Sequence, residues 1–308
     1  MSDLAAHPTL RVVVPAGAAS RARAQQLVTA LADAGRADAG SQVVVHAVEA
    51  QGAAGARAAL AAVVAADADV AVLEGAELPV EPPSALTLIA ALGRLDPRDA
   101  VVSRDGAGLA TLPRDRPVSV AVSGAARRAQ LQRQRRDLLL QEGPASLEDR
   151  LVAIADGDLD AAVVSVAELL LARPSSAGLV VVPLEHGEVL HRPGQGTTIV
   201  VGARTAATVR KRLAGLDHEL TRWELEAELE LLRQLSRDDD PLVGAHAEVR
   251  RSTTGQHRLV LLGLLTDATG SRRARASHET APEEAVTLGR AMAATLLEAT
   301  TPVTSHDH

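Results

Sequence analysis

The sequence predicts an α/β protein that continues into a smaller α+β region. From residue 10 to residue 201, short apolar stretches alternate with helical stretches of about 10–15 residues, which is typical of βαβ units and a mostly parallel sheet. From about residue 216 this alternation gives way to a charged amphipathic helix, two strand-like stretches and a final helix. The 308 residues, 46% hydrophobic and 23% charged, suffice for two or three globular domains.

The strands and helices of the α/β part differ in composition. Strand-like stretches are rich in Val, as in LRVVV at the start, and they suit buried strands. The predicted strands are residues 10–14, 42–48, 69–73, 100–103, 118–122, 160–164, 178–182 and 197–201. Helical stretches are rich in Ala, Arg, Gln and Leu, with stop signals at Gly35 and Pro174 and an N-cap at Ser146. The predicted helices are residues 20–34, 53–66, 84–92, 127–141, 146–156 and 166–172.

The C-terminal region has the elements of a small α+β domain. Residues 221–234 and 283–299 predict helices, and residues 245–251 and 258–265 predict strands. We expect residues 301–308 to form a disordered tail.

The composition excludes several kinds of chemistry. With no Cys, the chain can form no disulfide, thiolate nucleophile, zinc–thiolate site or iron–sulfur cluster. With no Phe or Tyr and a net charge of −7, it is unsuited to nucleic-acid binding. Neither a signal peptide nor an apolar stretch of membrane-spanning length is evident, so we expect a cytoplasmic protein without membrane partners.

Two polar clusters near the C-terminus are candidates for cation binding. The run Asp238-Asp239-Asp240 either binds a hard cation or forms a solvated loop, and the loop is favoured because further oxygen ligands at defined spacing are missing. His306 and His308 would bind a metal ion only weakly, because they lie at the terminus. We therefore expect no metal site.

Two further patterns have both a functional and a structural interpretation. Arg127, Arg128, Arg133, Arg135 and Arg136 crowd one predicted helix, either as an anion site or as a solvated face. The PGQG stretch at residues 193–196 permits a tight turn with close backbone approach, and it suits either a hinge between domains or a plain turn.

Six segments, in order along the chain, resemble motifs of the porphobilinogen deaminase (hydroxymethylbilane synthase) family. They are RLDPRDA at residues 94–100, ADVAV at 68–72 with the following Leu78-Pro79, AQLQR at 129–133 after two arginines, the segment 149–162, PGQG at 193–196, and Gly244-Ala245. The resemblance covers nearly the whole chain, and its strength lies in the order and spacing of the six segments.

The resemblance implies both a fold and an activity. The implied fold has two α/β domains similar to periplasmic binding proteins, between which the chain crosses twice, and then the small α+β domain. The implied boundaries are residues 1–93 with 194–214, residues 97–190, and residues 217–300. The family reaction condenses four porphobilinogen molecules into hydroxymethylbilane, primed by a dipyrromethane bound to a Cys.

The resemblance also implies positions for the site residues. The family's catalytic Asp falls at Glu77, and its cofactor-bearing Cys falls at Asp239. Arginines that bind the substrate's acetate and propionate groups fall at Arg150 and Arg204. A further family pair falls at Ala126 and Arg127 without a gap, or at Arg127 and Arg128 after a one-residue shift. Gly194, Gln195 and Gly196 match the family's hinge. Because a carboxylate cannot form the thioether, we expect no cofactor.

Three hypotheses about function follow. The chain is a family member that has lost catalysis and keeps a binding or regulatory role in tetrapyrrole metabolism. Alternatively, it is an active member with altered priming, holding a pyrrole non-covalently through its arginines. The third hypothesis is a binding module for small anions without pyrrole chemistry. In each case we expect a monomer whose partner is a small anionic molecule, and in the first two hypotheses this is porphobilinogen or another tetrapyrrole precursor.

Overall fold

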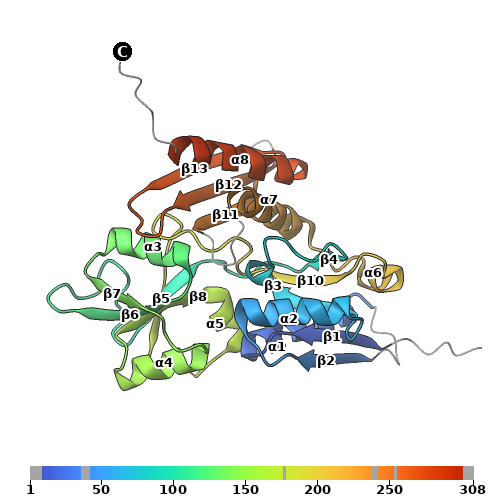
Figure 1. Ribbon diagram of the computed structural model, residues 1–308, viewed down its shortest axis with the longest axis horizontal. Helices are drawn as coiled ribbons and strands as arrows, with labels where there is room; N and C mark the ends of the chain where they lie inside the picture. Colours follow the sequence, from blue (N-terminus) through green and yellow to red (C-terminus); the bar gives the residue numbers. More distant parts are fainter. Residues whose placement is uncertain (1–8, 36–41, 176–177, 237–241, 253–254, 301–308) are drawn as a thin grey trace, which may run out of the picture. The chain divides into compact units, whose positions relative to one another are not determined.

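The computed structural model describes residues 9–35, 42–175, 178–236, 242–252 and 255–300 (Figure 1). Contacts within the chain divide it into two compact units. Unit 1 comprises Met1–Pro97, Ala167–Arg173 and Gly194–Arg222, and unit 2 comprises Arg98–Val166, Pro174–Pro193 and Trp223–His308. The predicted three-domain boundaries, in contrast, stay predictions.

Unit 1 is built on a five-stranded sheet in the order β2-β1-β3-β10-β4. The parallel strands β1 (Leu10–Val14), β2 (Val43–Ala47) and β3 (Val70–Glu74) lie on one side. β10 (Thr198–Ala203) pairs antiparallel with both β3 and β4 (Leu86–Ala91). The helices of this unit are α1 (Ala18–Asp33), α2 (Gly52–Val64), α5 (Val166–Ala172) and α6 (Ala207–Leu213).

Two sequence predictions for unit 1 are wrong. Residues 84–92 were expected to be helical, but Leu86–Ala91 form strand β4. The apolar run LTLIAA lacks a polar face, and it pairs along its length with β10, which a helix could not do. The sheet is mixed rather than mostly parallel, because β10 returns from a distant part of the chain in the opposite direction.

Unit 2 contains a second five-stranded sheet, in the order β7-β6-β8-β5-β9. It repeats the arrangement of the first sheet: β7 (Leu138–Gln141), β6 (Val118–Val122) and β8 (Ala161–Ser165) are parallel. β5 (Asp99–Ser103) is antiparallel to β8 and to β9 (Val180–Pro183). Helices α3 (Ala125–Gln134) and α4 (Leu147–Asp156) connect the parallel strands.

The helix expected over residues 127–141 ends early. Helix α3 stops at Gln134, and Leu138–Gln141 form strand β7. Arg135 leaves helical geometry at φ −138° and turns its side chain inward, where it donates to the carbonyls of Leu109, Leu112 and Pro113. The guanidinium therefore ends the helix by bonding to another part of the chain.

The rest of unit 2 is a three-stranded antiparallel sheet with helices. Its strands are β11 (Val243–Arg251), β12 (His257–Thr266) and β13 (Arg273–Thr280) in that order. Helix α8 (Ala285–Thr300) packs on β12 and β13, and α7 (Glu219–Leu235) precedes the sheet. Strand β13 was missed because its sequence, RARASHET, has the charge of a loop and only Ala274 in the core. The predicted α/β class with a small C-terminal α+β part is confirmed.

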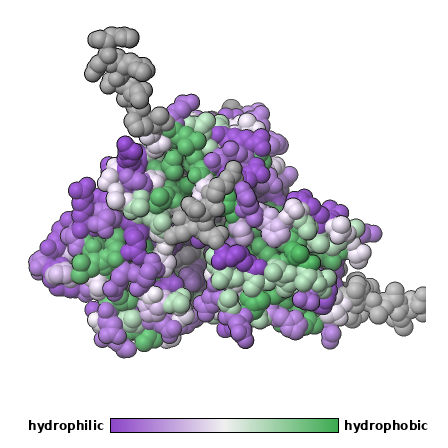
Figure 2. Space-filling view, in the orientation of Figure 1, coloured by the Kyte–Doolittle hydropathy of each residue, from purple (hydrophilic) through white to green (hydrophobic). Residues whose placement is uncertain are grey.

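The exposed hydrophobic residues of the described chain are dispersed over several elements. Exposed large hydrophobic residues such as Val45, Leu139 and Leu297 lie on separate elements. On the face shown in Figure 2, several apolar areas have hydrophilic residues around them. Within the described residues, no helix is both long and apolar enough to cross a bilayer. Asp239 and the tail at 301–308 lie outside the described residues.

Candidate functional site

The predicted catalytic carboxyl group, that of Glu77, follows strand β3 in unit 1. A single 3-10 turn, Gly75–Glu77, continues the strand, and Glu74 caps it. The Glu74 backbone N–H donates to Glu77 Oε2 at 3.0 Å, while the Glu74 side chain accepts from the Glu77 backbone. This reciprocal capping holds both carboxylates at the carboxyl end of the strand.

Arg23 and Gly196 complete the surroundings of these two carboxylates. The Arg23 guanidinium from α1, whose side chain is 5% exposed, lies 3.2 Å from Glu74 Oε1, and the Gly196 N–H donates to the same oxygen at 2.9 Å. Burial raises the pKa of Glu77 to about 6, with Glu74 and Glu168 adding to the rise and Arg23 opposing it. A carboxyl group of this kind can give or take a proton near neutral pH.

The predicted hinge residues pack directly on this turn. Gly194 and Gly196 have φ of +80° and +78°, and both are buried. A Cβ on Gly194 would lie 2.6 Å from the Gly75 carbonyl carbon, so only glycine permits the approach. Gln195 donates to the Pro97 carbonyl at 2.8 Å. The division between the two units falls between Pro193 and Gly194, and a hinge role at this position stays a prediction.

Arg127 forms a buried ion pair inside unit 2. Its Nε and Nη2 each donate at 2.8 Å to one carboxylate oxygen of Asp99 on β5, and its Nη1 donates to the Ser123 carbonyl. The side chain of Asp99 is 0% exposed and that of Arg127 is 16% exposed. This bidentate geometry is the strongest form of the arginine–carboxylate contact. The guanidinium therefore serves as the counterion of a buried protein carboxylate.

The other three predicted arginines contact more accessible groups. Arg128 donates to the carbonyls of Leu140 and Val122, and it pairs at 2.8 Å with Glu142, whose side chain is 71% exposed. Arg150 donates to two carbonyls of the segment that precedes α4, those of Pro144 and Ala145. Arg204, in unit 1, donates to the Ser84 carbonyl. Each of these three arginines thus has at least one hydrogen-bond acceptor that a ligand carboxylate could replace.

The predicted site residues thus fall into two groups. Arg127 and Arg128 share helix α3, and Arg150 lies on α4 of the same unit. Glu77 and Arg204 belong to unit 1.

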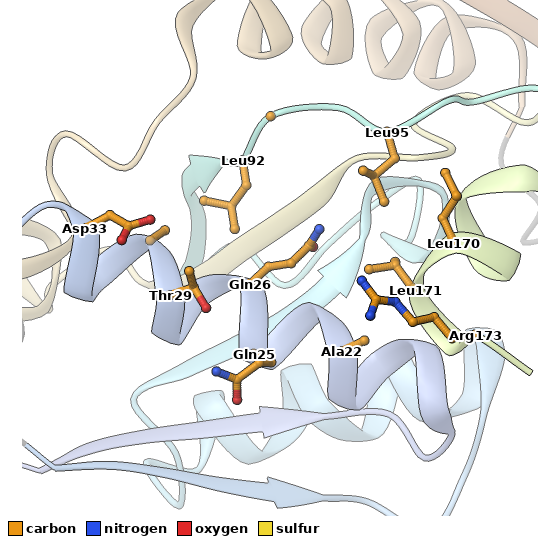
Figure 3. Close-up of a pocket in the computed structure, with 12 residues that line it drawn as sticks. Ala22, Gln25, Gln26, Thr29, Asp33, Leu92, Leu95, Leu170, Leu171 and Arg173 are labelled. Carbon is orange, nitrogen blue, oxygen red and sulfur yellow. The ribbon is translucent and has the colours of Figure 1, made fainter.

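A groove in unit 1 was not foreseen. It has a volume of about 840 Å³ and lies between α1, the segment after β4 and the end of α5 (Figure 3). In that view Gln26 of α1 points toward Leu92 and Leu95, and Leu170 and Arg173 close one end. The described lining contains none of the predicted site residues. Sequence spacing offered no signal for it, because its three walls come from distant segments.

A cluster of His186, His191 and His246 in unit 2 was also missed. Their ligand atoms lie within 4.8 Å of one another. The spacing of the first two, five residues apart on no regular element, gave no reason to pair them with a residue on β11.

Comparison with protein families decides the relationship. The model of "Porphobilinogen deaminase, dipyromethane cofactor binding domain" matches residues 22–211. A porphobilinogen deaminase of Nocardia farcinica is 37% identical over 234 residues, covering 75% of this chain and 66% of the relative. The chain belongs to the porphobilinogen deaminase family. For that relative the match spans just under two thirds of its length.

Further relatives agree with this assignment. A porphobilinogen deaminase of Mycolicibacterium paratuberculosis is 37% identical over 235 residues, covering 75% of this chain and 73% of the relative. One from Thermobifida fusca is 33% identical over 247 residues, covering 77% and 74%.

Solved structures give a weaker likeness. The Bordetella pertussis BvgS VFT2 domain covers 72% of this chain and 92% of its own, with a TM-score of 0.44 and 17% identity. The substrate binding protein of an amino acid ABC transporter covers 72% and 97%, with a TM-score of 0.42 and 12% identity. At these values the likeness carries no conclusion about this chain.

The family's cofactor poses a chemical problem here. The matching family model is described as a dipyrromethane cofactor binding domain, and the resemblance above implies a thioether to Cys. This chain has no Cys at any position. Its residues therefore do not fit a thioether-linked cofactor.

Proposed function

We propose that this chain is a porphobilinogen deaminase-like protein of tetrapyrrole biosynthesis that binds carboxylated pyrroles without a covalent cofactor and does not complete the family reaction. The observation that carries the proposal is the absence of Cys from a chain that otherwise follows the family. Aspartate at the family's cofactor position has no nucleophilic sulfur, so no thioether can form. A monomer in the cytoplasm remains the expected state.

The loss of the covalent anchor has a large kinetic cost. Holding a reactant in place can contribute about 7–11 kcal/mol toward lowering a barrier. Without a tether, each growing oligopyrrole is free to dissociate after every addition. Binding through ion pairs alone supplies much less, since one charge-assisted hydrogen bond contributes about 1.5–3 kcal/mol.

The proton-transfer group is nevertheless retained. Glu77 keeps a carboxyl group after β3, and its pKa of about 6 suits exchange of a proton with a pyrrole nitrogen or with the leaving amine. The side chain is one methylene longer than the family's Asp, which a different rotamer can accommodate. Glu77 therefore supports binding of a pyrrole N–H and does not by itself account for a loss of turnover.

The arginines differ in their suitability for ligand carboxylates. Arg127 is committed to buried Asp99, and releasing it would break a bidentate pair with a buried carboxylate. Arg150 and Arg204 bond to exposed segments, so a ligand carboxylate can compete for them at low cost. At Arg128 a ligand carboxylate can replace exposed Glu142 while the bonds to the carbonyls of Leu140 and Val122 stay. Of the predicted set, Arg128, Arg150 and Arg204 are thus the better candidates for acetate and propionate groups.

Calorimetric titration with porphobilinogen tests the proposal. We expect binding by the wild type, about tenfold weaker binding by Arg128→Ala and Arg150→Ala, and unchanged binding by Arg258→Ala. Arg258 is a suitable control because it pairs on the surface of β12 with Glu279, whose side chain is 61% exposed. No heat from the wild type, or equal affinity in all four proteins, would contradict pyrrole binding at these arginines.

A further inference from the structure

The strongest unassigned feature is the cluster of three histidines in unit 2. His186 and His191 lie between β9 and β10, and His246 lies on β11. The His186 ring stacks on that of His246, with centroids 3.7 Å apart and planes 18° from parallel. The His191 ring stands edge-on to both, at 5.6 and 5.3 Å. Two of the three are almost fully enclosed, since His191 is 1% exposed and His246 is 8% exposed.

The segment that carries His186 and His191 is hydrogen-bonded to three elements, α3, β11 and β13. Gln130 of α3 both donates to the Leu190 carbonyl, at 2.9 Å, and accepts from its N–H, at 2.8 Å. The Ala245 N–H of β11 donates to the His191 carbonyl at 3.0 Å. Arg275 of β13 donates to the carbonyls of His186 and Gly187. These bonds hold the backbone of the segment, and with it the positions from which the imidazoles project, in place before any ligand arrives.

Hydrogen bonding sets the tautomer of His191. Its Nδ1 lies 3.0 Å from the Arg192 carbonyl oxygen, which can only accept, so Nδ1 carries the proton. His246 Nδ1 therefore donates to His191 Nε2 across 3.2 Å, and a metal ion held by these two atoms would displace the proton of His246 Nδ1. On the far side of that ring, His246 Nε2 lies 4.0 Å from Glu248 Oε2. A carbonyl that accepts from the distal ring nitrogen, as the Arg192 carbonyl does for His191, is a usual partner of a metal-binding histidine, whereas Glu248 lies beyond hydrogen-bond distance of His246.

The spacing also suits a transition metal. Zinc–nitrogen bonds of about 2.0–2.1 Å in a tetrahedral site separate the ligand nitrogens by about 3.3 Å. The His191–His246 pair, at 3.2 Å, already has this separation. The ligand atom of His186, the more exposed member, lies within 4.8 Å of the other two, and its ring must rotate out of the stack on His246 to reach the same ion.

We propose that His186, His191 and His246 form a binding site for one divalent transition metal ion, of which Zn²⁺ fits best. Imidazole ligands favour zinc and its neighbours over Mg²⁺ or Ca²⁺, which prefer oxygen. Three protein ligands leave a fourth position for water or an anion. A bound ion joins the segment between β9 and β10 to strand β11 and thereby stabilises unit 2. The proposal is independent of pyrrole binding.

The test uses untagged full-length protein and the metals alone. Equilibrium dialysis with Zn²⁺ should give one ion per chain, and Co²⁺ should give the intense visible bands of a tetrahedral complex. His246→Gln and His186→Gln should each weaken binding at least tenfold, and Zn²⁺ should raise the Tm of the wild type but not of these variants.

Two controls distinguish the cluster from other histidines. His257→Gln removes an exposed imidazole on β12, and His306→Gln with His308→Gln removes the two terminal ones; both variants should bind like the wild type. Absence of Co²⁺ bands, or binding that is lost in the terminal variant and kept in His186→Gln, would overturn the proposal. Because His186 is the more exposed member, its variant is informative even if His246→Gln does not fold.

Discussion

Arg127→Ala should destabilise the protein far more than loss of a surface arginine. Arg127 is the bidentate partner of Asp99, whose side chain is 0% exposed. Removing one member of a buried ion pair costs about 3–5 kcal/mol, since the remaining charge keeps its desolvation penalty. That cost lowers the folded-to-unfolded ratio by roughly two to four powers of ten, a large share of the stability of an ordinary domain.

Urea denaturation followed by far-UV circular dichroism measures this cost. The fluorescence of the single Trp, Trp223 on α7, gives a second probe of the same transition. The matched control is Arg258→Ala, which removes a half-exposed surface pair on β12 and should cost less than about 1 kcal/mol.

A double-mutant cycle separates pairing from other losses. Asp99→Ala combined with Arg127→Ala should be less destabilising than the sum of the single changes, with a coupling of about 1 kcal/mol or more. The reasoning is refuted if Arg127→Ala unfolds like the Arg258→Ala control and yet loses porphobilinogen binding. That result would make Arg127 a ligand-binding group rather than an internal counterion.

Three further predictions concern the carboxyl site, the glycine turn and the cofactor position. Folding raises the pKa of Glu77 from 4.5 to about 6. In urea titrations the wild type should therefore lose about 2 kcal/mol relative to Glu77→Gln as the pH rises through this interval, and a difference between the two proteins that does not change with pH would contradict this. Gly196→Ala should lower the free energy of unfolding by about 1–3 kcal/mol in thermal unfolding, because φ is +78° and the new Cβ would lie 2.9 Å from the Leu95 carbonyl oxygen. The control Gly93→Ala should be near neutral, because no heavy atom lies within 4 Å of its new Cβ. Asp239→Cys alone should leave porphobilinogen turnover far below that of a relative assayed in parallel, because the resemblance places two further cationic groups of the family at Pro15 and Ala76 here, and full activity in that variant would contradict this.

Local sequence predicted most of the parallel strands and failed where long-range pairing decided the structure. Runs of Val such as those in β1 and β6 were correctly predicted as strands because β-branched residues favour strands, and the structure buries four of the five residues in each. The run LTLIAA fits a helix or a strand equally well, and only its partner β10, more than a hundred residues away, decides between them. Likewise, α3 ends at Arg135 because of carbonyls that lie more than twenty residues earlier.

The candidate site shows the same limit. Motif order was enough to locate Glu77 after β3, but the pairing of Arg127 with Asp99 joins residues on different elements. The histidine cluster joins His191 to His246 across 55 residues of chain. Neither contact has a local periodicity, so each became visible only when the tertiary structure brought the elements together.

Turnover of porphobilinogen by the purified wild type tests the central claim most directly. The protein would be incubated with porphobilinogen and the product measured as porphyrin after acid oxidation, with the Mycolicibacterium paratuberculosis relative assayed in parallel. Intact-mass spectrometry on the same sample reports any covalently attached pyrrole. We expect no porphyrin and the mass of the bare polypeptide, because the chain has no Cys to hold a primer. Porphyrin formation at a rate comparable to that of the relative, or a mass increased by a dipyrromethane, would contradict the account.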